Sequence, residues 1–496
     1  MMARHLPILL VAFPLIMSFL TFMVGIFYRR VSYYFAFITM AFCTFAALTI
    51  TFNISATHKS LRYHIGGWPP PWGIEYAIDE LNSFLLPALA LIGLLVLLHC
   101  RQSVKREIPE DKIHVFYALI LLQMTGLFGM TVTSDIFNLY VLLEIASFSA
   151  YGLIAAGKRG AEFAAFRYMI FGTIGACAYL LGVGYLYILT GSLNMTDLSQ
   201  ILPRIYGSTT LLAGFTFLVL GLGIKMAFFP LHIWLPDAYS TAPSQVSTLL
   251  APLFTKVSAY VLFRLVLNVF HPFYSLSLYP IFSLLGWIAA GGILYAGVMA
   301  IAQSDVRRML CYILVVEIGY IVFGLSAGNR LGLMGAILHI LNDMFMMALL
   351  FAAWNSINLL IKSSKIADWH GINKRYPLPI FTFILGGLAV IGIPPFCGFF
   401  SKWYLLLGLI KANNFIFAAI LLVSSLFTAI CFFRIIEAVY LTPGNNHSLL
   451  PPSPRTPGYL KEGIVLGLLT FTLIILGLAS GYLMEFIEKF SALGTL

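Results

Sequence analysis

Charged side chains interrupt the long apolar stretches of this sequence. Eight fall well inside such stretches, namely Lys225, Lys256, Arg264, Lys402, Arg434, Glu144, Glu317 and Asp343. A charge at the centre of a membrane helix costs about 2.5–3.5 kcal/mol, so eight unpaired charges would cost on the order of 20 kcal/mol. A chain that keeps them must pair them, hydrate them or use them. For Arg264 and Arg434 a purely structural ion pair is as strong an alternative as a functional role, because arginine keeps its proton at accessible pH.

Lysine and glutamate can do proton chemistry in such a place. Burial penalises the charged form of either side chain, so each can gain and lose a proton near neutral pH. Glu144 follows Asp135 by nine residues, which is about 14 Å along a helix. Glu317 follows Asp305 by twelve residues, about 18 Å by the same rise. Both acids are therefore expected near the middle of a hydrocarbon layer about 30 Å thick.

Two of the apolar segments contain prolines close to a lysine. In segment 210–235, Lys225 lies in the run GLGIKMAFFPLHIWLPDAYSTAP, which continues past the end of the segment. In segment 377–410, Lys402 is the second-last residue of the run VIGIPPFCGFFSKW. Proline removes an amide donor and clashes with the preceding turn, so a break is expected in each helix. Irregular backbone at membrane depth persists only inside protein or around a wet cavity. One broken helix with a lysine in each half indicates an inverted-repeat transporter.

Two histidines accompany these breaks. His232 follows the first break, and His339 stands four residues before Asp343, which places the last two on one helical face. Histidine titrates near neutrality and could carry protons between lysines that are too far apart for direct transfer. His339 suits this role. For His232 two roles remain open, a proton relay or a hydrogen bond to carbonyls freed by the break.

The composition requires a lipid environment. Of the 496 residues 60% are hydrophobic and 10% are charged, whereas a soluble chain has about a quarter charged. We predict an all-α polytopic membrane protein of about 14 transmembrane helices with two inverted five-helix repeats, each containing a broken helix. Residues 1–112 would form helices 1–3, residues 113–268 and 280–441 the two repeats, and residues 442–496 the C-terminal helix.

The net charge of +10 indicates the orientation of the chain in the membrane, because lysine and arginine are unevenly divided between the two sides. With alternating loops, seventeen lysines and arginines fall on one side and seven on the other. Cytoplasmic loops carry the excess, so both termini are expected outside, in the periplasm, for a multi-pass protein of the cell inner membrane. Nucleic acid is not an expected partner. The six cysteines are scattered singly, and no nicotinamide, flavin or zinc motif is present, so we expect no metal and no cofactor.

Five ordered motifs carry a family resemblance over roughly residues 110–440. They are SDIFNLYVLLEIASFSAYGLIA, GLGIKMAFFPLHIWLPDAYSTAPSQVS, FTKVSAYVLFRL, DVRRMLCYILVVEIGY and GIPPFCGFFSKW. Together they resemble the antiporter-like membrane subunits of respiratory complex I and of the Mrp cation/proton antiporters. The upstream RYHIGGWPPPWGIEYAID is similar to the D-type Mrp antiporter proteins and their relatives in membrane-bound hydrogenases.

The resemblance implies roles for particular residues. Those that match the family's proton-translocating positions are Glu144 in the fifth span, Lys225 in the broken helix, Lys256 in the eighth span, His339 as the linking histidine and Lys402 in the twelfth span. Supporting roles are assigned to His232, Glu317, Asp343 and Arg264. The chain departs from the family at two places. Met347 stands where many members have a lysine, and Asp343 where many have a histidine. This puts the usual second inlet in doubt.

The resemblance thus implies a proton-translocating, Na+/H+ antiporter-type subunit of a multi-subunit cation/proton antiporter. The alternative is a proton-pumping membrane subunit of an NADH:quinone oxidoreductase or of an energy-converting hydrogenase. Expected partners are other subunits of the complex, the lipid bilayer, protons and, as a second candidate ion, Na+. The chain has no catalytic motif of its own, so whether it serves a redox-driven enzyme is left open. An intramembrane enzyme would need paired acids or a Ser/His set at one depth, and an inert scaffold fits the buried charges poorly.

Overall fold

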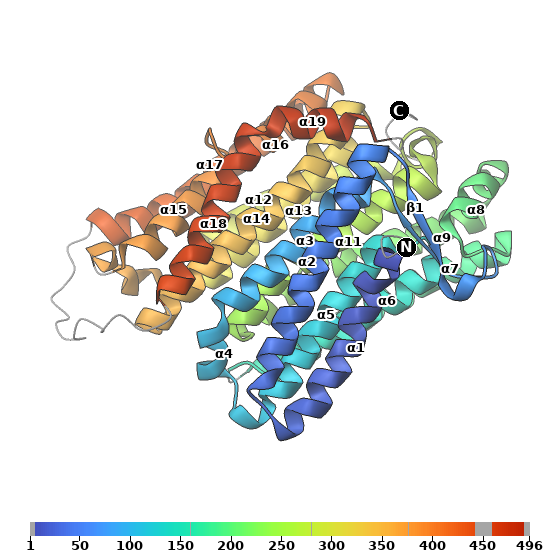
Figure 1. The fold of residues 1–496 in the computed structure, drawn as a ribbon. Helices are drawn as coiled ribbons and strands as arrows, with labels where there is room; N and C mark the ends of the chain where they lie inside the picture. The colour runs from blue at the N-terminus through green and yellow to red at the C-terminus, as the bar shows by residue number, and fades with distance from the viewer. Residues whose placement is uncertain (1–4, 159, 279, 375, 442–458, 491–496) are drawn as a thin grey trace.

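Long helices packed side by side make up most of the computed structural model (Figure 1). The structure describes residues 5–158, 160–278, 280–374, 376–441 and 459–490. The first part contains α1 (Leu6–Phe27), α2 (Val31–Thr57), α3 (Glu80–His99) and the short α4 (Arg101–Glu107). Between α2 and α3 the chain forms a hairpin of two antiparallel strands, β1 (Leu61–His64) and β2 (Glu75–Ile78). The expectation of an all-helical chain did not include this hairpin.

Two further sets of helices follow. The first consists of α5 (Ile113–Val132), α6 (Ile136–Ala155), α7 (Ala161–Thr190), α8 (Met195–Ile201), α9 (Thr209–Lys225), α10 (Trp234–Thr241) and α11 (Ser244–Arg264). The second consists of α12 (Ile281–Ala302), α13 (Val306–Ser326), α14 (Arg330–Ile361), α15 (Pro377–Ile391), α16 (Cys397–Lys411) and α17 (Phe415–Ile436). The chain then forms α18 (Tyr459–Leu478) and α19 (Ser480–Glu488).

The described residues include eleven helices long and apolar enough to cross a membrane. The count is twelve if the segment Glu462–Leu478 and α19, which meet at a bend of 64°, form one span. Two shorter apolar helices, α9 and α15, are the first parts of the segments in which breaks were expected. The chain is therefore a helical membrane protein with many spans.

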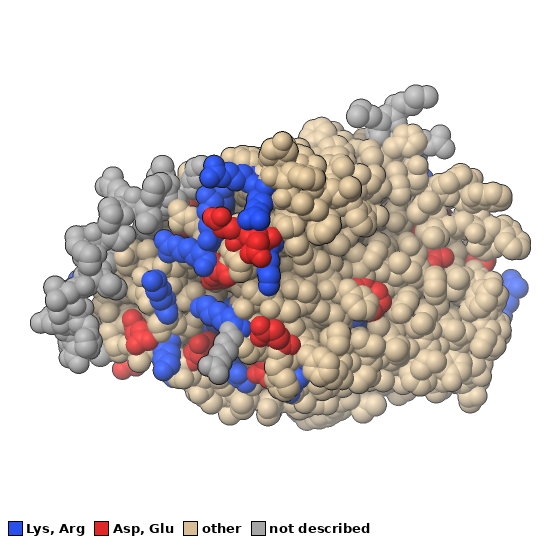
Figure 2. Space-filling model, turned by 90° about the horizontal axis from the view of Figure 1, so that it is seen from below, with Lys and Arg blue, Asp and Glu red and all other residues tan. Residues whose placement is uncertain are grey.

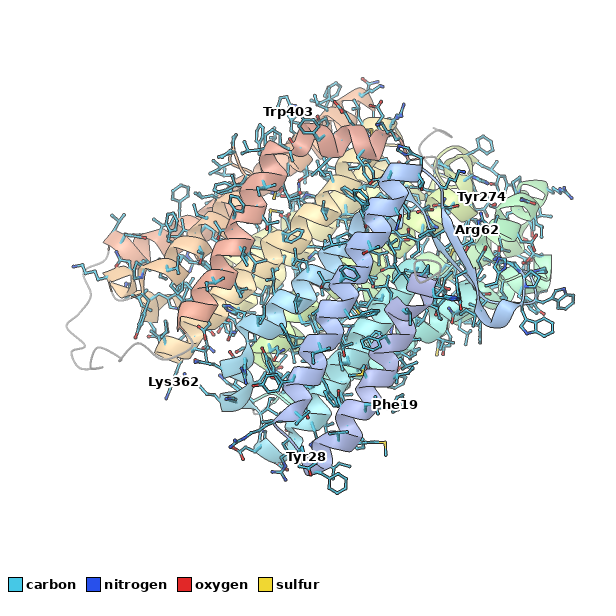
Figure 3. All side chains as sticks on the ribbon, viewed as in Figure 1. Phe19, Tyr28, Arg62, Tyr274, Lys362 and Trp403 are labelled. Carbon is cyan, nitrogen blue, oxygen red and sulfur yellow. The ribbon has the colours of Figure 1, made fainter. Side chains whose placement is uncertain are left out.

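The helices differ in what surrounds them. The apolar windows of α14 and of the segment Ser244–Val269, which includes α11, are completely buried, so these two helices occupy the centre of the bundle. By contrast α1 exposes apolar side chains such as Phe19, and Tyr28 just after it is also exposed; both point outward in Figure 3. Seen from below, Lys, Arg, Asp and Glu gather mainly in one region and much of the surface carries none of them (Figure 2). An apolar outer surface of this kind is suited to lipid.

The molecule has two opposite ends, the hairpin face and the α4 face. The hairpin face carries β1, β2 and α8, and both α1 and α19 have an end there (Figure 1). The α4 face carries α4 and the turn between α14 and α15 (Figure 1). Figure 3 places Arg62 at the hairpin face and Lys362 at the α4 face.

Both proline-containing segments are interrupted as helices. In segment 210–235, α9 ends at Lys225, and residues 226–233 separate it from α10. In segment 377–410, α15 ends before Gly392, whose φ of +92° is one that L side chains rarely adopt. A long segment without these prolines, α14, runs unbroken for 32 residues. The length of an apolar segment alone therefore does not break its helix.

Candidate functional site

The first cluster of buried charge joins α6 to the end of α9. Asp135 caps α6 by accepting from the amides of Phe137 and Asn138, and Glu144 lies in the middle of the helix. Lys225 Nζ donates to Glu144 Oε1 at 3.1 Å and to Ser147 Oγ at 2.7 Å. Lys225 is completely buried, whereas the Glu144 side chain keeps 15% exposure. The structure therefore brings together two of the residues that match the family's proton-translocating positions.

The second cluster lies between the two central helices. Lys256 Nζ of α11 is 2.8 Å from Asp343 Oδ2 of α14, and both side chains are fully buried. The same ammonium donates to the carbonyl of Ala251 at 3.1 Å, so it points along α11 toward the α4 face. Asp343 was expected to act with His339 on its own helix. Its ion-pair partner is instead Lys256, because α11 packs against α14 at this point.

The third cluster has one carboxylate between two basic groups. Glu317 of α13 lies 3.0 Å from His339 Nε2 and 3.5 Å from Lys402 Nζ. His339 Nδ1 is 3.0 Å from Ser401 Oγ, and Lys402 Nζ lies 4.6 Å from the centre of the Tyr320 ring. Glu317, named only as a supporting residue from sequence, is therefore the centre of this cluster.

Side chains bond to backbone carbonyl groups on both sides of the breaks. The last carbonyls of a helix have no amide partner within it. Trp234 Nε1 donates to the Ile224 carbonyl at 3.1 Å, and Lys402 Nζ donates to the Val390 carbonyl at 2.6 Å. Asn342 of α14 also donates to the Cys397 carbonyl, at 2.8 Å. These contacts fix the positions of the helix ends that border the first and third clusters.

We call these three groups together the buried charge line. Its members are Glu144, Lys225, Lys256, Asp343, His339, Glu317 and Lys402. Each basic group in it has a carboxylate partner. Removing one member of a buried pair typically costs about 3–5 kcal/mol, because the other charge is left uncompensated. Asp343 and His339, one turn apart on α14, link the second cluster to the third.

The remaining predicted residues lie beside this line. Arg264 ends α11 and pairs with Asp79, the N-cap of α3, beside a polar cavity of about 460 Å³ at the hairpin face. Arg434 bonds to the carbonyl of Ile301 at the end of α12. Both arginines thus have structural partners.

Two more positions can be placed. The His232 ring packs 5.4 Å from Phe229 and 5.6 Å from Tyr295, and it interacts with the Pro230 backbone within the break. That contact favours the second of the two roles considered for His232. Met347 is completely buried on α14, one turn from Asp343.

Sequence reasoning missed the polar groups that complete each cluster. Ser147 had a usable signal, because it lies three residues after Glu144 and therefore on the same face of the helix. Ser401 adjoins Lys402 in the sequence, but nothing there indicates that it faces His339. Asp79 had no signal, since its contact with Arg264 joins residues 185 positions apart.

Comparison with known proteins identifies the family. The family model described as "NADH:quinone oxidoreductase/Mrp antiporter, TM" matches residues 133–428, which include the whole buried charge line. The chain belongs to this family. Its relatives include the N-type protein of the NADH-quinone oxidoreductase of Desulforudis audaxviator, which is 45% identical over 92% of this chain and 91% of its own length. They also include the D-type protein of the Na(+)/H(+) antiporter of Bacillus subtilis, 29% identical over 86% of this chain and 84% of that protein.

Solved structures of the family have the same fold. A chain of the membrane-bound sulfane sulfur reductase, an archaeal respiratory membrane complex, superposes with a TM-score of 0.90 at 28% identity, covering 98% of this chain and 97% of that one. A chain of the Mrp complex from Dietzia sp. DQ12-45-1b gives 0.89 at 22% identity, with 100% and 98% covered. The resemblance to antiporter-like subunits is thus confirmed, and this family member is similar to subunits of both antiporter and respiratory complexes.

Proposed function

We propose that this chain is the proton-translocating membrane subunit of a multi-subunit complex, and that protons move along the buried charge line. The observation that carries the proposal is the line itself. Seven titratable side chains from two halves of one chain form three adjacent clusters, each with a carboxylate next to a lysine. Arginine takes no part in it, and lysine, histidine and carboxylate are the groups that can exchange protons.

The proposed sequence of events begins at the first cluster. A proton from the cytoplasm reaches the Glu144–Lys225 pair, and separation of that pair moves the proton on to Lys256. Asp343 and His339 then connect Lys256 to Glu317 and Lys402, from which the proton leaves to the outside. The order follows the contacts, since each cluster shares a helix or a helix contact with the next.

The energy for transport comes from partner subunits under either of two alternatives. An Na+/H+ antiporter-type complex is the first, supported by the relative from the Na(+)/H(+) antiporter of Bacillus subtilis. A redox-driven complex is the second, and the relative at 45% identity, named as part of an NADH-quinone oxidoreductase, supports it comparably. The proteins that copurify with this chain would decide between them, because only the second requires redox subunits.

We propose fourteen spans and two inverted repeats. The eleven long helices, the bent pair and the two broken segments, each counted once, give this number. Within residues 113–268 and 280–441 the elements follow the same order, in which a broken fourth helix precedes the last. Asp135 caps α6 and Asp305 caps α13, but α6 begins at the hairpin face and α13 at the α4 face. Opposite directions for equivalent helices support inversion. Residues 1–112 and 442–496 then lie outside the repeats.

From the excess of lysine and arginine we propose that the α4 face is cytoplasmic and that the hairpin face and both termini are outside. Single cysteines at Lys362 and Arg62, in an otherwise cysteine-free chain, test this orientation. A membrane-impermeant thiol reagent should label the first only from the cytoplasmic side and the second only from outside. Labelling of both positions from the same side would overturn the fourteen-span arrangement.

Transport itself is tested with Glu144→Ala and Lys225→Ala in the intact complex reconstituted into vesicles. Either change should abolish proton transport, because it leaves the partner charge buried and alone. Recovery of partner subunits at the wild-type ratio controls for assembly. Arg434→Gln is a matched control, since it removes a cation outside the line. Wild-type transport in both alanine variants would refute the proposal.

A further inference from the structure

Tyr320 of α13 is a fully buried side chain that contacts the third cluster and is not a member of the buried charge line. It follows Glu317 by three residues, so the two lie on the same face of the helix. The centre of the Tyr320 ring is 4.6 Å from Lys402 Nζ and 5.7 Å from the centre of the His339 ring. The ring therefore lies against both basic partners of Glu317, and the mechanism above gives it no task.

The hydroxyl end of Tyr320 is fixed to a neighbouring helix. Tyr320 Oη lies 2.6 Å from Oγ of Ser424, a fully buried residue of α17. Ser424 donates its own proton to the Leu421 carbonyl at 2.9 Å, so in the bond between the two hydroxyls the tyrosine is the donor. The hydroxyl is thus engaged on the side of α17, and the Lys402 ammonium meets the ring.

The three groups around the Lys402 ammonium differ in what they can do with a proton. Glu317 Oε1, at 3.5 Å, is a carboxylate oxygen that can accept one. The Val390 carbonyl, at 2.6 Å, and the Tyr320 ring are neutral groups that are not bases. A ring attracts a cation through the negative face of its quadrupole, and the attraction is stronger where water is excluded. Lys402 therefore has contacts that stabilise its ammonium without taking its proton.

We propose that the Tyr320 ring, held in place by Ser424, is a holding site for protonated Lys402 after the lysine separates from Glu317. The separation leaves the Glu317 carboxylate with His339, 3.0 Å away, and leaves the ammonium with the ring and the helix-end carbonyl. No proton is transferred in this step, because the N–H bonds of the ammonium stay intact. Since neither holding group is a base, the proton stays on Lys402 until it is released to the outside.

A purely structural role is the alternative, in which Tyr320 only joins α13 to α17. Phe323, three residues further along α13, makes a contact of that kind. It is fully buried, and its ring stacks on that of Phe417 of α17 with the centres 4.9 Å apart. Phe323→Leu is therefore a matched control for Tyr320→Leu. Both changes remove an aromatic contact between the same two helices, and the second also removes the ring beside Lys402.

Proton transport is measured with the intact complex in vesicles and is normalised to the amount of assembled complex. Tyr320→Leu should lower the rate about tenfold, the size expected for loss of a desolvated cation–π contact, while Phe323→Leu stays near wild type. Tyr320→Phe and Ser424→Ala should each lower the rate about threefold, because the ring remains but loses the hydrogen bond that fixes it. Combining these two changes should lower the rate no further, since both break the same bond.

Two further measurements test whether Tyr320 acts through Lys402. Tyr320→Leu together with Lys402→Ala should be no slower than Lys402→Ala alone, because the ring then has no ammonium to hold. Replacing Tyr320 by phenylalanine with one, two or three ring fluorines should lower the rate stepwise relative to Tyr320→Phe. Fluorine withdraws electrons from the ring face and weakens its attraction for a cation, while the packing of the ring is kept. The fluorinated series therefore decides the question even where Tyr320→Leu does not assemble.

The holding site is overturned by equal rates in Tyr320→Leu and Phe323→Leu, by losses that multiply when Tyr320→Leu is combined with Lys402→Ala, or by rates that ignore fluorination. The proposal rests on the proposed function, because it needs Lys402 to carry protons. The two can fail separately. If Glu144→Ala and Lys225→Ala still abolish transport while the tests at Tyr320 fail, the proposed function stands without the holding site.

Discussion

The first and third clusters each hold a carboxylate next to a lysine, but the two carboxylates have different numbers of basic partners. In the first, Glu144 pairs with one lysine and its side chain keeps 15% exposure. In the third, Glu317 has no exposure and lies between a histidine and a lysine. The lysine differs as well, since Lys225 is supported by a serine hydroxyl, whereas Lys402 is held by a helix-end carbonyl and an aromatic ring.

This difference indicates whether the charges of the first or of the third cluster separate more easily. The first is a single ion pair next to exposed surface, so a small movement of α9 would part Glu144 from Lys225. The third keeps Glu317 partnered even when Lys402 moves, because His339 remains 3.0 Å away. We infer that the ion pair of the first cluster opens and closes during transport, as a switch. The third cluster acts as a store, in which a proton is held between groups that share it.

Of the single changes in the second and third clusters, the largest effect is expected in the second, which lies between the other two. Asp343→Asn should reduce proton transport by about a hundredfold, because Lys256 is buried and loses the carboxylate that pairs with it. The measurement is proton transport by the intact complex, with partner recovery as the control for assembly. Near-normal rates in Asp343→Asn would remove this carboxylate from the path and leave it a role in fixing side-chain orientation.

Met347→Lys is a second test of the pair formed by Asp343 and Lys256. Met347 is buried one turn from Asp343, and a lysine there would restore the residue type common in the family and compete with Lys256 for the carboxylate. We expect no gain in transport, since a lysine here would draw the Asp343 carboxylate away from Lys256 Nζ, which lies 2.8 Å from it. A gain in Met347→Lys would show instead that a path through this position is dormant.

How much of this site the sequence could predict depends on the kind of contact. Glu144 and Lys225 were predictable, because proline marks the broken helix and a buried glutamate needs a cation. The partner of Asp343 was not, because i, i+4 spacing places Asp343 and His339 on one face but does not say which helix packs there. Asp343 pairs with Lys256 on α11, whereas His339 pairs with Glu317 on α13.

The fold shows the same limit. Apolar length predicted a helical membrane protein with many spans, and proline predicted the two breaks, since both signals depend on local sequence. The hairpin of β1 and β2 includes most of the segment RYHIGGWPPPWGIEYAID, for which local sequence gave no strand prediction. The bend of 64° before α19 and the pairing of Arg264 with Asp79 depend on packing between distant segments, so no short window of sequence contains them.

A smaller loss is expected when the third cluster loses its lysine. Lys402→Ala should lower transport about tenfold, much less than the complete loss expected for Lys225→Ala, because Glu317 still has His339 as a partner. The double variant His339→Ala with Lys402→Ala removes both partners and should abolish transport. If Lys402→Ala alone abolishes transport, the two-partner arrangement gives no protection and the distinction between switch and store fails.

The smallest effects are expected at the two serines, which make a matched pair. Ser147 Oγ accepts a bond from Lys225 Nζ at 2.7 Å, and Ser401 Oγ lies 3.0 Å from His339 Nδ1. A hydrogen bond of this kind contributes about 0.5–1.5 kcal/mol net, so each serine-to-alanine change should lower the rate about threefold. Ser147→Ala should have the larger effect of the two, because Ser147 Oγ lies 2.7 Å from the Lys225 ammonium, whereas Ser401 Oγ lies 3.0 Å from an imidazole nitrogen. Rates of proton transport for both variants, measured in one vesicle preparation series, test the order. A larger loss in Ser401→Ala would show that the orientation of His339 limits transport more than the stability of the first ion pair does.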